Sequence, residues 1–531
     1  MATNSKTEEQ NSTRIVAVID IGASSVRMLI AQILPDQTTE ELESLSQTVS
    51  LGRDSFMRGE IRRETIEDCV QVLRIYRQKL REYSIDRPED VRVVATSAVR
   101  EADNRLAFQD RIYIATGFAI EPFDEASLHR TTYIGIKPIL DQCPELQSGQ
   151  TVVCEVGGGT TEILALTNSK VTFANTYRLG SLRLIKTLEA FKTPLNQSRG
   201  LVESQINKIA HQIRISLGQS ENRKLVVMGG DMRLAASKID SAFDAKLVTR
   251  FSVDALAKFT DSIIDTPPET LVSEFQMPIG DATSFAPALM ANLQLAKSLD
   301  VDQFIVASVN LREGLIKELL AGNDWIGRAD EQILQSAVAL GQKFNFDIDH
   351  AKHVDHLVNS MFQQMTSMHQ LGDRWRLFLR VAALLHEVGL AIGQRSYHKH
   401  SMYIIRNSSL FGFSSRDLEL VALIARYHRR ALPQLRHVAY SNLNRDQRAS
   451  ISKLSAILRV CKALDASRNQ RVPDIQVQAK NGKLRLSVAG MTDLSLEQLE
   501  LRRERVLFEN IFGMRPELSV VPLTESSQDV R

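Results

Sequence analysis

Two segments of the chain share an uncommon order of residue types: an acid, an aliphatic residue, a glycine, two small residues and a hydroxyl-bearing residue. The first copy is DIGASS at 20–25 and the second is EVGGGT at 155–160. Each copy follows one apolar run and precedes another, so both are expected to be turns between β-strands. Glycine allows a sharp turn in which backbone N–H groups approach an anion, and the hydroxyls add donors. The repeat therefore predicts a duplicated fold with a phosphate between its halves.

The composition narrows the class of protein. With 531 residues, the chain is long enough for three or four domains, each with its own core. A net charge of +2 does not indicate a polyanionic partner, and no specific nucleic acid is expected. The four cysteines, at 69, 143, 154 and 461, lack CxxC spacing, which indicates a reducing cytoplasm rather than disulfides or a zinc knuckle. There is no signal-peptide pattern and no apolar run of membrane-spanning length, so we expect a cytoplasmic protein.

The order of patterns divides the chain into parts. Residues 1–13 are polar and are expected to be a disordered lead. Two α/β halves are expected at 14–134 and 135–315, where glycine turns separate strand-like and helix-like runs. From 316 to 472 the runs become amphipathic helices, and nine of the eleven histidines lie at or beyond position 350. Residues 473–531 are expected to form a small α+β domain, with a hairpin turn at Asn481-Gly482.

A third polar segment follows the strand expected at 91–97, where Thr96, Ser97 and Arg100 precede or open a helix. One interpretation is local: a hydroxyl caps the helix and Arg100 lies on the surface. The other is functional: the helix N-terminus holds a phosphate and the guanidinium assists it. These residues alone favour the local interpretation.

Several motifs, in their order along the chain, resemble the exopolyphosphatase/guanosine pentaphosphate phosphatase (Ppx/GppA) family in its long form, with an HD-like C-terminal domain. They are DIGASSVRMLIAQ, VVATSAVREADNRLAF, EVGGGTTEI, RLGSLRL, LREGLI, LLHEVGLAI and ILRVCKALDASRNQR. The resemblance covers almost the whole chain. It implies an α/β fold class: a duplicated actin/Hsp70/sugar-kinase-type, ribonuclease H-like core, then an all-α HD-like domain and a small α+β tail.

The resemblance also implies an activity. Members of the family are hydrolases that release the terminal phosphate of inorganic polyphosphate or the 5′-phosphate of guanosine pentaphosphate, with Mg²⁺ as cofactor. The expected enzyme is therefore a Mg²⁺-dependent phosphoanhydride hydrolase of the exopolyphosphatase type. A homodimer is expected on the same ground.

The site residues implied by the resemblance come from the three polar segments. Catalytic roles fall to Asp20, Arg100, Glu125, Glu155 and Glu162, and the metal ligands among them are Asp20, Glu155 and Glu162. The phosphate-binding residues are the small and hydroxyl-bearing ones: Gly22, Ser24, Ser25, Thr96, Ser97, Gly157, Gly158, Gly159 and Thr160.

Three departures from the family pattern bear on activity. Ser127 and Leu128 stand where the family has two glutamates that supply the catalytic base, and Glu125 would replace them only after a loop shift. Glu155 replaces an aspartate, and Ser24 replaces an asparagine. Misplacement by about 1 Å can cost about 100-fold in rate. The alternative function is therefore a weak or inactive relative that binds polyphosphate or a nucleotide as a regulator. An ATP-dependent sugar kinase on the same core is disfavoured by the ATSAVREA segment.

The helical region offers a second candidate metal set. In HD phosphohydrolases a histidine, a His-Asp pair and a distal aspartate bind metal; here His353 or His356, then His386-Glu387 and Asp465, fall in comparable order. A purely structural role for these residues is the favoured interpretation. Basic side chains that are candidates for lining a channel for a polyanion gather in two segments of the same region: Lys399, His400, Arg426, His428, Arg429 and Arg430.

Overall fold

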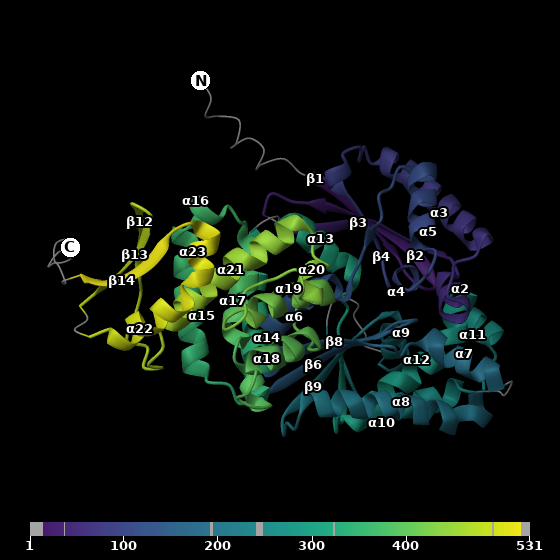
Figure 1. Cartoon of the computed structure of the whole chain (residues 1–531). Coiled ribbons are helices and arrows are strands. Elements are labelled where there is room, and N and C mark those ends of the chain that lie inside the picture. The colour runs from purple at the N-terminus through teal and green to yellow at the C-terminus, as the bar shows by residue number, and fades with distance from the viewer. Residues whose placement is uncertain are drawn as a thin grey trace. The chain divides into compact units, whose positions relative to one another are not determined.

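A computed structural model describes residues 14–36, 38–191, 195–240, 248–321, 324–490 and 493–521 (Figure 1). The chain forms two compact units, Met1–Ala329 and Asp330–Arg531. The predicted disordered lead at 1–13 lies outside the described residues. No helix among the described residues has both the length and the apolar character that a membrane span requires.

The first sheet of the first unit begins with the expected hairpin and has the strand order β3-β2-β1-β4-β5. Its strands are β1 (Arg14–Ile21), β2 (Ser25–Ile33), β3 (Thr39–Thr48), β4 (Val91–Ala95) and β5 (Glu121–Pro122). The β1–β2 and β2–β3 pairs are antiparallel, whereas β1–β4 and β4–β5 are parallel.

The second sheet repeats this arrangement. Its strands are β6 (Gln150–Val156), β7 (Thr161–Thr167), β8 (Lys170–Tyr177), β9 (Arg223–Met228), β10 (Thr249–Ser252) and β11 (Gln303–Val306). From β8 the order is β8-β7-β6-β9-β11, with the same sequence of antiparallel and parallel pairs, and β10 adds an antiparallel edge strand. The predicted duplication of the core is confirmed.

Both faces of β1 are buried, which explains why the strand reads as a nearly continuous apolar run. Ala17, Ile19 and Ile21 pack with residues of the helices between β3 and β5. Val16 and Val18 pack on the other face, against residues of α6 and α13. Because successive side chains of a strand alternate between faces, Asp20 belongs to the face of Val16 and Val18.

Helices follow the strands of both halves. In the first half they are α2 (Leu51–Arg58), α3 (Arg63–Glu82), α4 (Ser97–Arg100), α5 (Arg105–Thr116) and α6 (Glu125–Gln142). In the second half they are α7 (Ser181–Phe191), α8 (Leu195–Leu217), α9 (Gly230–Ile239), α10 (Val253–Ile263), α11 (Pro268–Phe275), α12 (Ile279–Ser298) and α13 (Leu311–Ala321).

The second unit is helical first and mixed at its end. The helices are α14 (Asp324–Lys343), α15 (Ile348–Gln364), α16 (Thr366–His369), α17 (Asp373–Leu385), α18 (Tyr397–Arg406), α19 (Ser415–Arg426), α20 (Val438–Ser441) and α21 (Arg445–Ala463). The tail contains β12 (Gln476–Lys480), β13 (Lys483–Ala489), α22 (Ser495–Glu504), α23 (Val506–Phe512) and β14 (Arg515–Val521). Asn481 and Gly482 both have positive φ, as a two-residue hairpin turn between β12 and β13 requires. The predicted order of an α/β core, a helical region and an α+β tail is confirmed.

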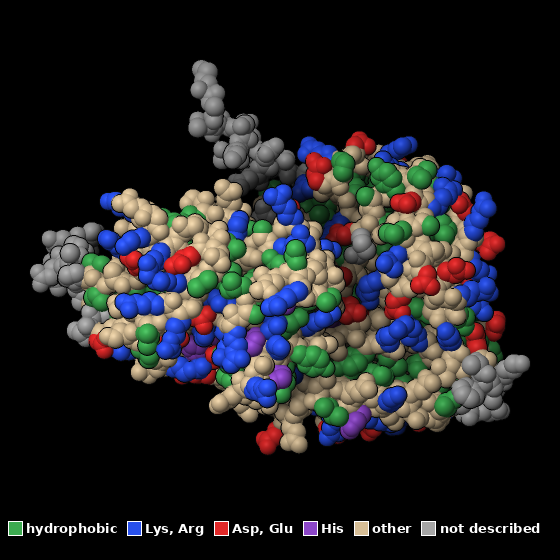
Figure 2. Space-filling model, viewed as in Figure 1, with side chains coloured by type: hydrophobic (Ala, Val, Ile, Leu, Met, Phe, Trp, Pro, Cys, Tyr) green, Lys and Arg blue, Asp and Glu red, His purple; other side chains and the backbone are tan. Residues whose placement is uncertain are grey.

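Charges of both signs are spread over the molecular surface. On the face shown in Figure 2, Lys and Arg side chains of the first unit are interspersed with Asp and Glu. This distribution agrees with the small net charge of +2. The predicted basic channel of the second unit is wrong for one of its residues, because His428 is fully buried.

Candidate active site

The two repeated turns have the same backbone hydrogen bond. Gly22 N–H donates to Ser25 O at 3.0 Å, and Gly157 N–H donates to Thr160 O at 2.8 Å. A second bond is also repeated: the helix after the third strand of each half donates to the turn. Gly52 N–H bonds Ala23 O in the first half. Leu182 N–H bonds Gly158 O in the second. The sequence repeat is therefore a structural repeat.

The two turns lie against each other beside the side chain of Leu182. A Cβ atom added to Gly158 would lie 3.1 Å from Ala23 Cβ and 3.0 Å from Leu182 Cδ1. Gly180 packs so closely on the second turn that an added Cβ would lie 2.4 Å from Gly158 O. A larger residue at Gly180 would displace the backbone of the turn, so the glycine of the RLGSLRL motif keeps the turn in place.

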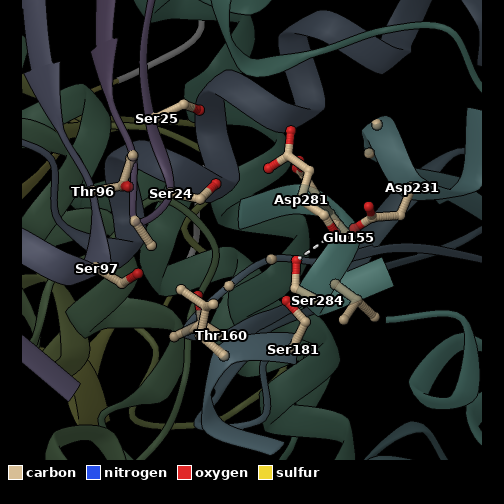
Figure 3. Close-up of a pocket in the computed structure, with 18 of the residues that line it drawn as sticks. Ser24, Ser25, Thr96, Ser97, Glu155, Thr160, Ser181, Asp231, Asp281 and Ser284 are labelled. Atoms are coloured by element: carbon tan, nitrogen blue, oxygen red, sulfur yellow. Dashed lines mark hydrogen bonds between the residues drawn. The ribbon is translucent and has the colours of Figure 1, made fainter. Parts of the chain in front are cut away.

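A cavity of about 300 Å³ lies where the two halves meet, and most of the predicted site residues line it (Figure 3). The predicted residues in its wall are Asp20, Gly22, Ser24, Ser25, Thr96, Ser97, Glu155, Gly157, Gly158, Thr160 and Glu162. Figure 3 shows the hydroxyls of the first half on one side of this space and Glu155 on the other. The hydroxyl-rich wall offers the donors that a phosphate needs.

Asp20 ends β1 with a buried carboxylate. Burial raises its pKa, while the positive charges of Arg312 and Arg27 oppose that rise. Arg312 Nη1 lies 3.9 Å from Asp20 Oδ2, and Arg27 faces Asp20 across the hairpin. The other oxygen, Oδ1, is buried and has no hydrogen-bond partner among the described residues. That oxygen is available to a ligand.

Glu155 and Glu162 face each other across the second hairpin. Burial raises the pKa of Glu155, and the neighbouring charge of Glu162 raises it further. Arg233 opposes this rise, and Asp20 adds to it. A cation placed beside Glu155 would stabilise its carboxylate form.

Glu162 is oriented by two residues that the sequence did not indicate. Its Oε2 accepts a hydrogen bond from Thr176 Oγ1, and His129 Nε2 lies 3.1 Å from the same oxygen. Its Oε1 is buried without a hydrogen-bond partner among the described residues. His129 comes from α6 and Thr176 from β8, so only the folded chain brings them to Glu162. As in Asp20, one carboxylate oxygen contacts a neighbouring side chain, and the other has no hydrogen-bond partner among the described residues.

Residues 124–128, where the resemblance places the catalytic base, contribute no carboxylate to the cavity wall. Asp124 caps α6 by accepting a hydrogen bond from Ser127 N at 2.8 Å. Leu128, rather than a carboxylate, lines the cavity. Glu125 is about half exposed and lies 4.0 Å from Arg100, whose Nη1 donates to Phe123 O. Neither Arg100 nor Glu125 is among the residues that line the cavity, and neither is Gly159.

Several cavity residues were missed from the sequence. Arg27, Asp231, Asp281 and Ser284 all line the cavity, together with the turn at Gly229-Gly230. Figure 3 shows Asp231 and Asp281 on the same side as Glu155. Burial raises the pKa of Asp231 to about 7, and the charge of Asp281 contributes to the rise. The hairpin register would have identified Arg27, because it lies opposite Asp20, but Asp281 comes from a helix with no motif.

Comparison with known proteins gives matches over both units. The model described as the Ppx/GppA phosphatase family matches residues 12–322, and the model of Ppx/GppA phosphatase domain III matches residues 334–505. A protein from Aeromonas hydrophila subsp. hydrophila named guanosine-5'-triphosphate,3'-diphosphate pyrophosphatase is 23% identical over 516 residues. The alignment covers 94% of this chain and 97% of that protein. The protein of the same name from Aeromonas salmonicida is also 23% identical.

Two solved structures share the fold. An exopolyphosphatase from Cytophaga hutchinsonii superposes with a TM-score of 0.52 at 18% identity, covering 58% of this chain and 98% of that chain. An exopolyphosphatase-like protein superposes with a TM-score of 0.50 at 18% identity, covering 59% of this chain and 99% of that chain. At this identity the likeness concerns the fold alone.

Proposed function

This chain belongs to the Ppx/GppA phosphatase family, and we propose that it is a hydrolase that releases the terminal phosphate of inorganic polyphosphate or of guanosine pentaphosphate. The names of its relatives support both substrate classes, since one is a guanosine-5'-triphosphate,3'-diphosphate pyrophosphatase and another an exopolyphosphatase. The observation that carries the proposal is the cavity in which two matched turns, several hydroxyls and five carboxylates meet.

The terminal phosphate would lie against the hydroxyl-bearing wall. Ser24 and Ser25 come from the first turn, Thr160 from the second, and Thr96 and Ser97 from the end of β4 and the start of α4. Because phosphoryl transfer depends mainly on alignment and charge stabilisation, fixed donors on three sides of the phosphate serve it well. Arg27, also in the wall, is the cavity guanidinium placed to oppose phosphate charge.

The residues present fit a Mg²⁺ ion. Asp20 Oδ1 and Glu162 Oε1 are buried carboxylate oxygens without hydrogen-bond partners among the described residues, and Glu155 lies opposite Glu162. Carboxylate oxygens with water are the ligands that Mg²⁺ prefers. Asp20, Glu155 and Glu162 would hold it, and when bound it supplies positive charge to the phosphate oxygens. His129 and Thr176 keep Glu162 in position for this task.

The mechanism also needs a base that activates water. Glu125, the predicted base, is half exposed and close to Arg100, outside the cavity wall. Glu155 is an acid in the wall whose pKa is raised by burial, and a raised pKa makes a carboxylate a better proton acceptor. The apolar Leu128 in the wall favours the second candidate function, a weak or inactive relative that binds the same ligands as a regulator.

Release of phosphate from polyphosphate with Mg²⁺ tests the proposal. We expect the wild-type protein to release phosphate about 100-fold faster than a Glu162→Gln variant, which keeps the shape and removes the charge. Guanosine pentaphosphate in a parallel assay decides between the two substrates. Tight binding of either ligand in calorimetry, with no release above the variant, would replace the hydrolase by the regulator. A homodimer stays a prediction from the resemblance, and a cytoplasmic location stays a prediction from the cysteine spacing and the N-terminal sequence pattern.

A further inference from the structure

Three buried side chains of the second unit bring potential metal-ligand atoms together. In the sequence, they are far from every residue of the proposed catalytic mechanism. His350 lies in the first turn of α15, and His386 and Glu387 follow the end of α17. One ligand atom from each lies within 4.8 Å of the other two. The Nε2 atoms of His350 and His386 are each 3.9 Å from an oxygen of Glu387. All three side chains are less than a tenth exposed.

The hydrogen bonds on the far side of each imidazole determine its tautomer. His350 Nδ1 lies 2.7 Å from Asp465 Oδ2, and His386 Nδ1 lies 2.7 Å from the carbonyl oxygen of Ala383. An ionised carboxylate and a carbonyl can only accept, so in a neutral ring each Nδ1 carries the hydrogen. Each Nε2 then presents a lone pair. Neither Nε2 has a hydrogen-bond partner among the described residues.

The carboxylate of Glu387 is fixed in a similar way. Tyr397 donates its hydroxyl to Oε1 at 3.0 Å, and Arg468 Nη2 donates to Oε2 at 2.5 Å. These contacts fix the carboxylate beside the two imidazoles. Two nitrogen lone pairs therefore face a carboxylate, and no described residue donates a hydrogen bond to either nitrogen. Acceptors arranged in this way repel, and native interiors seldom leave such groups without a partner.

We infer that His350, His386 and Glu387 bind one divalent transition-metal ion of the zinc class. Two imidazole nitrogens and one carboxylate are a known zinc ligand set that leaves a fourth position for water. Two atoms that each lie 2.0–2.2 Å from one ion can be at most about 4.4 Å apart. The 3.9 Å from each Nε2 to an oxygen of Glu387 satisfies this limit. Asp465 and the Ala383 carbonyl orient the imidazoles, as partners of metal-bound histidines do.

The cluster contains a histidine that the sequence did not indicate. The first histidine was expected to be His353 or His356, but His350, one turn earlier on α15, lies beside His386 and Glu387. His356 is about half exposed, 3.8 Å from Asp474. The inferred metal is the alternative to the purely structural role that the sequence favoured for the whole set. The inference is independent of the proposed function, because its residues take no part in the cavity of the first unit.

Zinc binding to the untagged full-length protein tests the inference. After treatment with a chelator, we expect calorimetry to show one equivalent of Zn²⁺ bound by His350, His386 and Glu387, and Co²⁺ to give visible absorption bands of a four-coordinate nitrogen–oxygen site. Glu387→Gln, which preserves volume, should weaken Zn²⁺ binding by about 100-fold or more. His356→Ala, on the same helix as His350, is the matched control and should bind Zn²⁺ as the wild type does.

A thermal measurement covers the case in which a variant loses its fold. Zn²⁺ at about 100 times its dissociation constant should raise the unfolding temperature of the wild type by about 5 °C or more. It should not raise that of Glu387→Gln or His386→Ala. Absence of a bound equivalent in the wild type would overturn the inference and leave a buried water between the three side chains. Zn²⁺ binding that both variants retain would overturn it too.

Discussion

The cavity of the first unit and the His350-His386-Glu387 site of the second unit both contain buried carboxylates, yet they differ in their other donors. The cavity offers carboxylate oxygens and hydroxyls around a space of about 300 Å³. The second site offers two imidazole nitrogens and one carboxylate, all buried. Oxygen donors suit Mg²⁺, and imidazole suits Zn²⁺. The comparison leads to the proposal that this chain separates Mg²⁺ from Zn²⁺ by donor type.

The largest expected effect is a separate loss in each of two glutamine variants: one loses phosphate release and the other loses Zn²⁺ affinity. Glu162→Gln should lower phosphate release about 100-fold and leave Zn²⁺ affinity unchanged, because it removes a charge from the cavity alone. Glu387→Gln should lower Zn²⁺ affinity about 100-fold. Phosphate release and zinc calorimetry on both variants measure the four values. Phosphate release at the wild-type rate in Glu162→Gln would show that Glu162 takes no part in the mechanism. Loss of Zn²⁺ binding in the same variant would show that the two sites are not independent.

A second prediction concerns the apolar position in the cavity wall. Leu128→Glu places a carboxylate where the family has one and should raise phosphate release by about 10-fold or more, since general base catalysis contributes on the order of 100-fold. Ser127→Glu is the control, because Ser127 does not line the cavity. The rates of the two variants with polyphosphate and Mg²⁺ are compared. Equal rates in the two variants would show that a carboxylate at position 128 does not act as the catalytic base.

His129 gives a smaller effect, because it acts through Glu162. His129→Ala should lower phosphate release by about 10-fold, because Glu162 loses the partner 3.1 Å away. His211→Ala, on the exposed surface of α8, is the control. An unchanged rate in His129→Ala would show that Thr176 alone positions Glu162.

The smallest effect is on stability. Burial raises the pKa of Asp231 to about 7, so between about pH 4 and 7 the folded protein holds a proton that the unfolded chain has lost. Stability therefore falls as the pH rises through that window. Asp231→Asn should be more stable than the wild type at pH 8, by about 1 kcal/mol or more, since one pKa unit corresponds to about 1.4 kcal/mol, and equal to it near pH 4. Urea unfolding without Mg²⁺ measures this, with exposed Asp265→Asn as control. A gain that is the same at both pH values would contradict the assignment.

The sequence predicts what short segments determine. The turns at 20–25 and 155–160 follow from residues adjacent in the chain, so the duplicated core and many of the cavity-lining residues are predictable from the sequence. His129 and Asp281 were missed because they reach the site from helices distant in sequence. His350 and His353 differ by less than one helical turn, and spacing alone does not say which of them faces His386. Such choices depend on tertiary packing.

Anomalous diffraction from crystals grown with one equivalent of Zn²⁺ and an excess of Mn²⁺, used in place of Mg²⁺, tests the contrast between the two sites most directly. Manganese prefers oxygen donors as magnesium does. We predict a zinc peak between His350, His386 and Glu387 and a manganese peak among Asp20, Glu155 and Glu162. A zinc peak in the cavity, or none beside His350, would contradict the account.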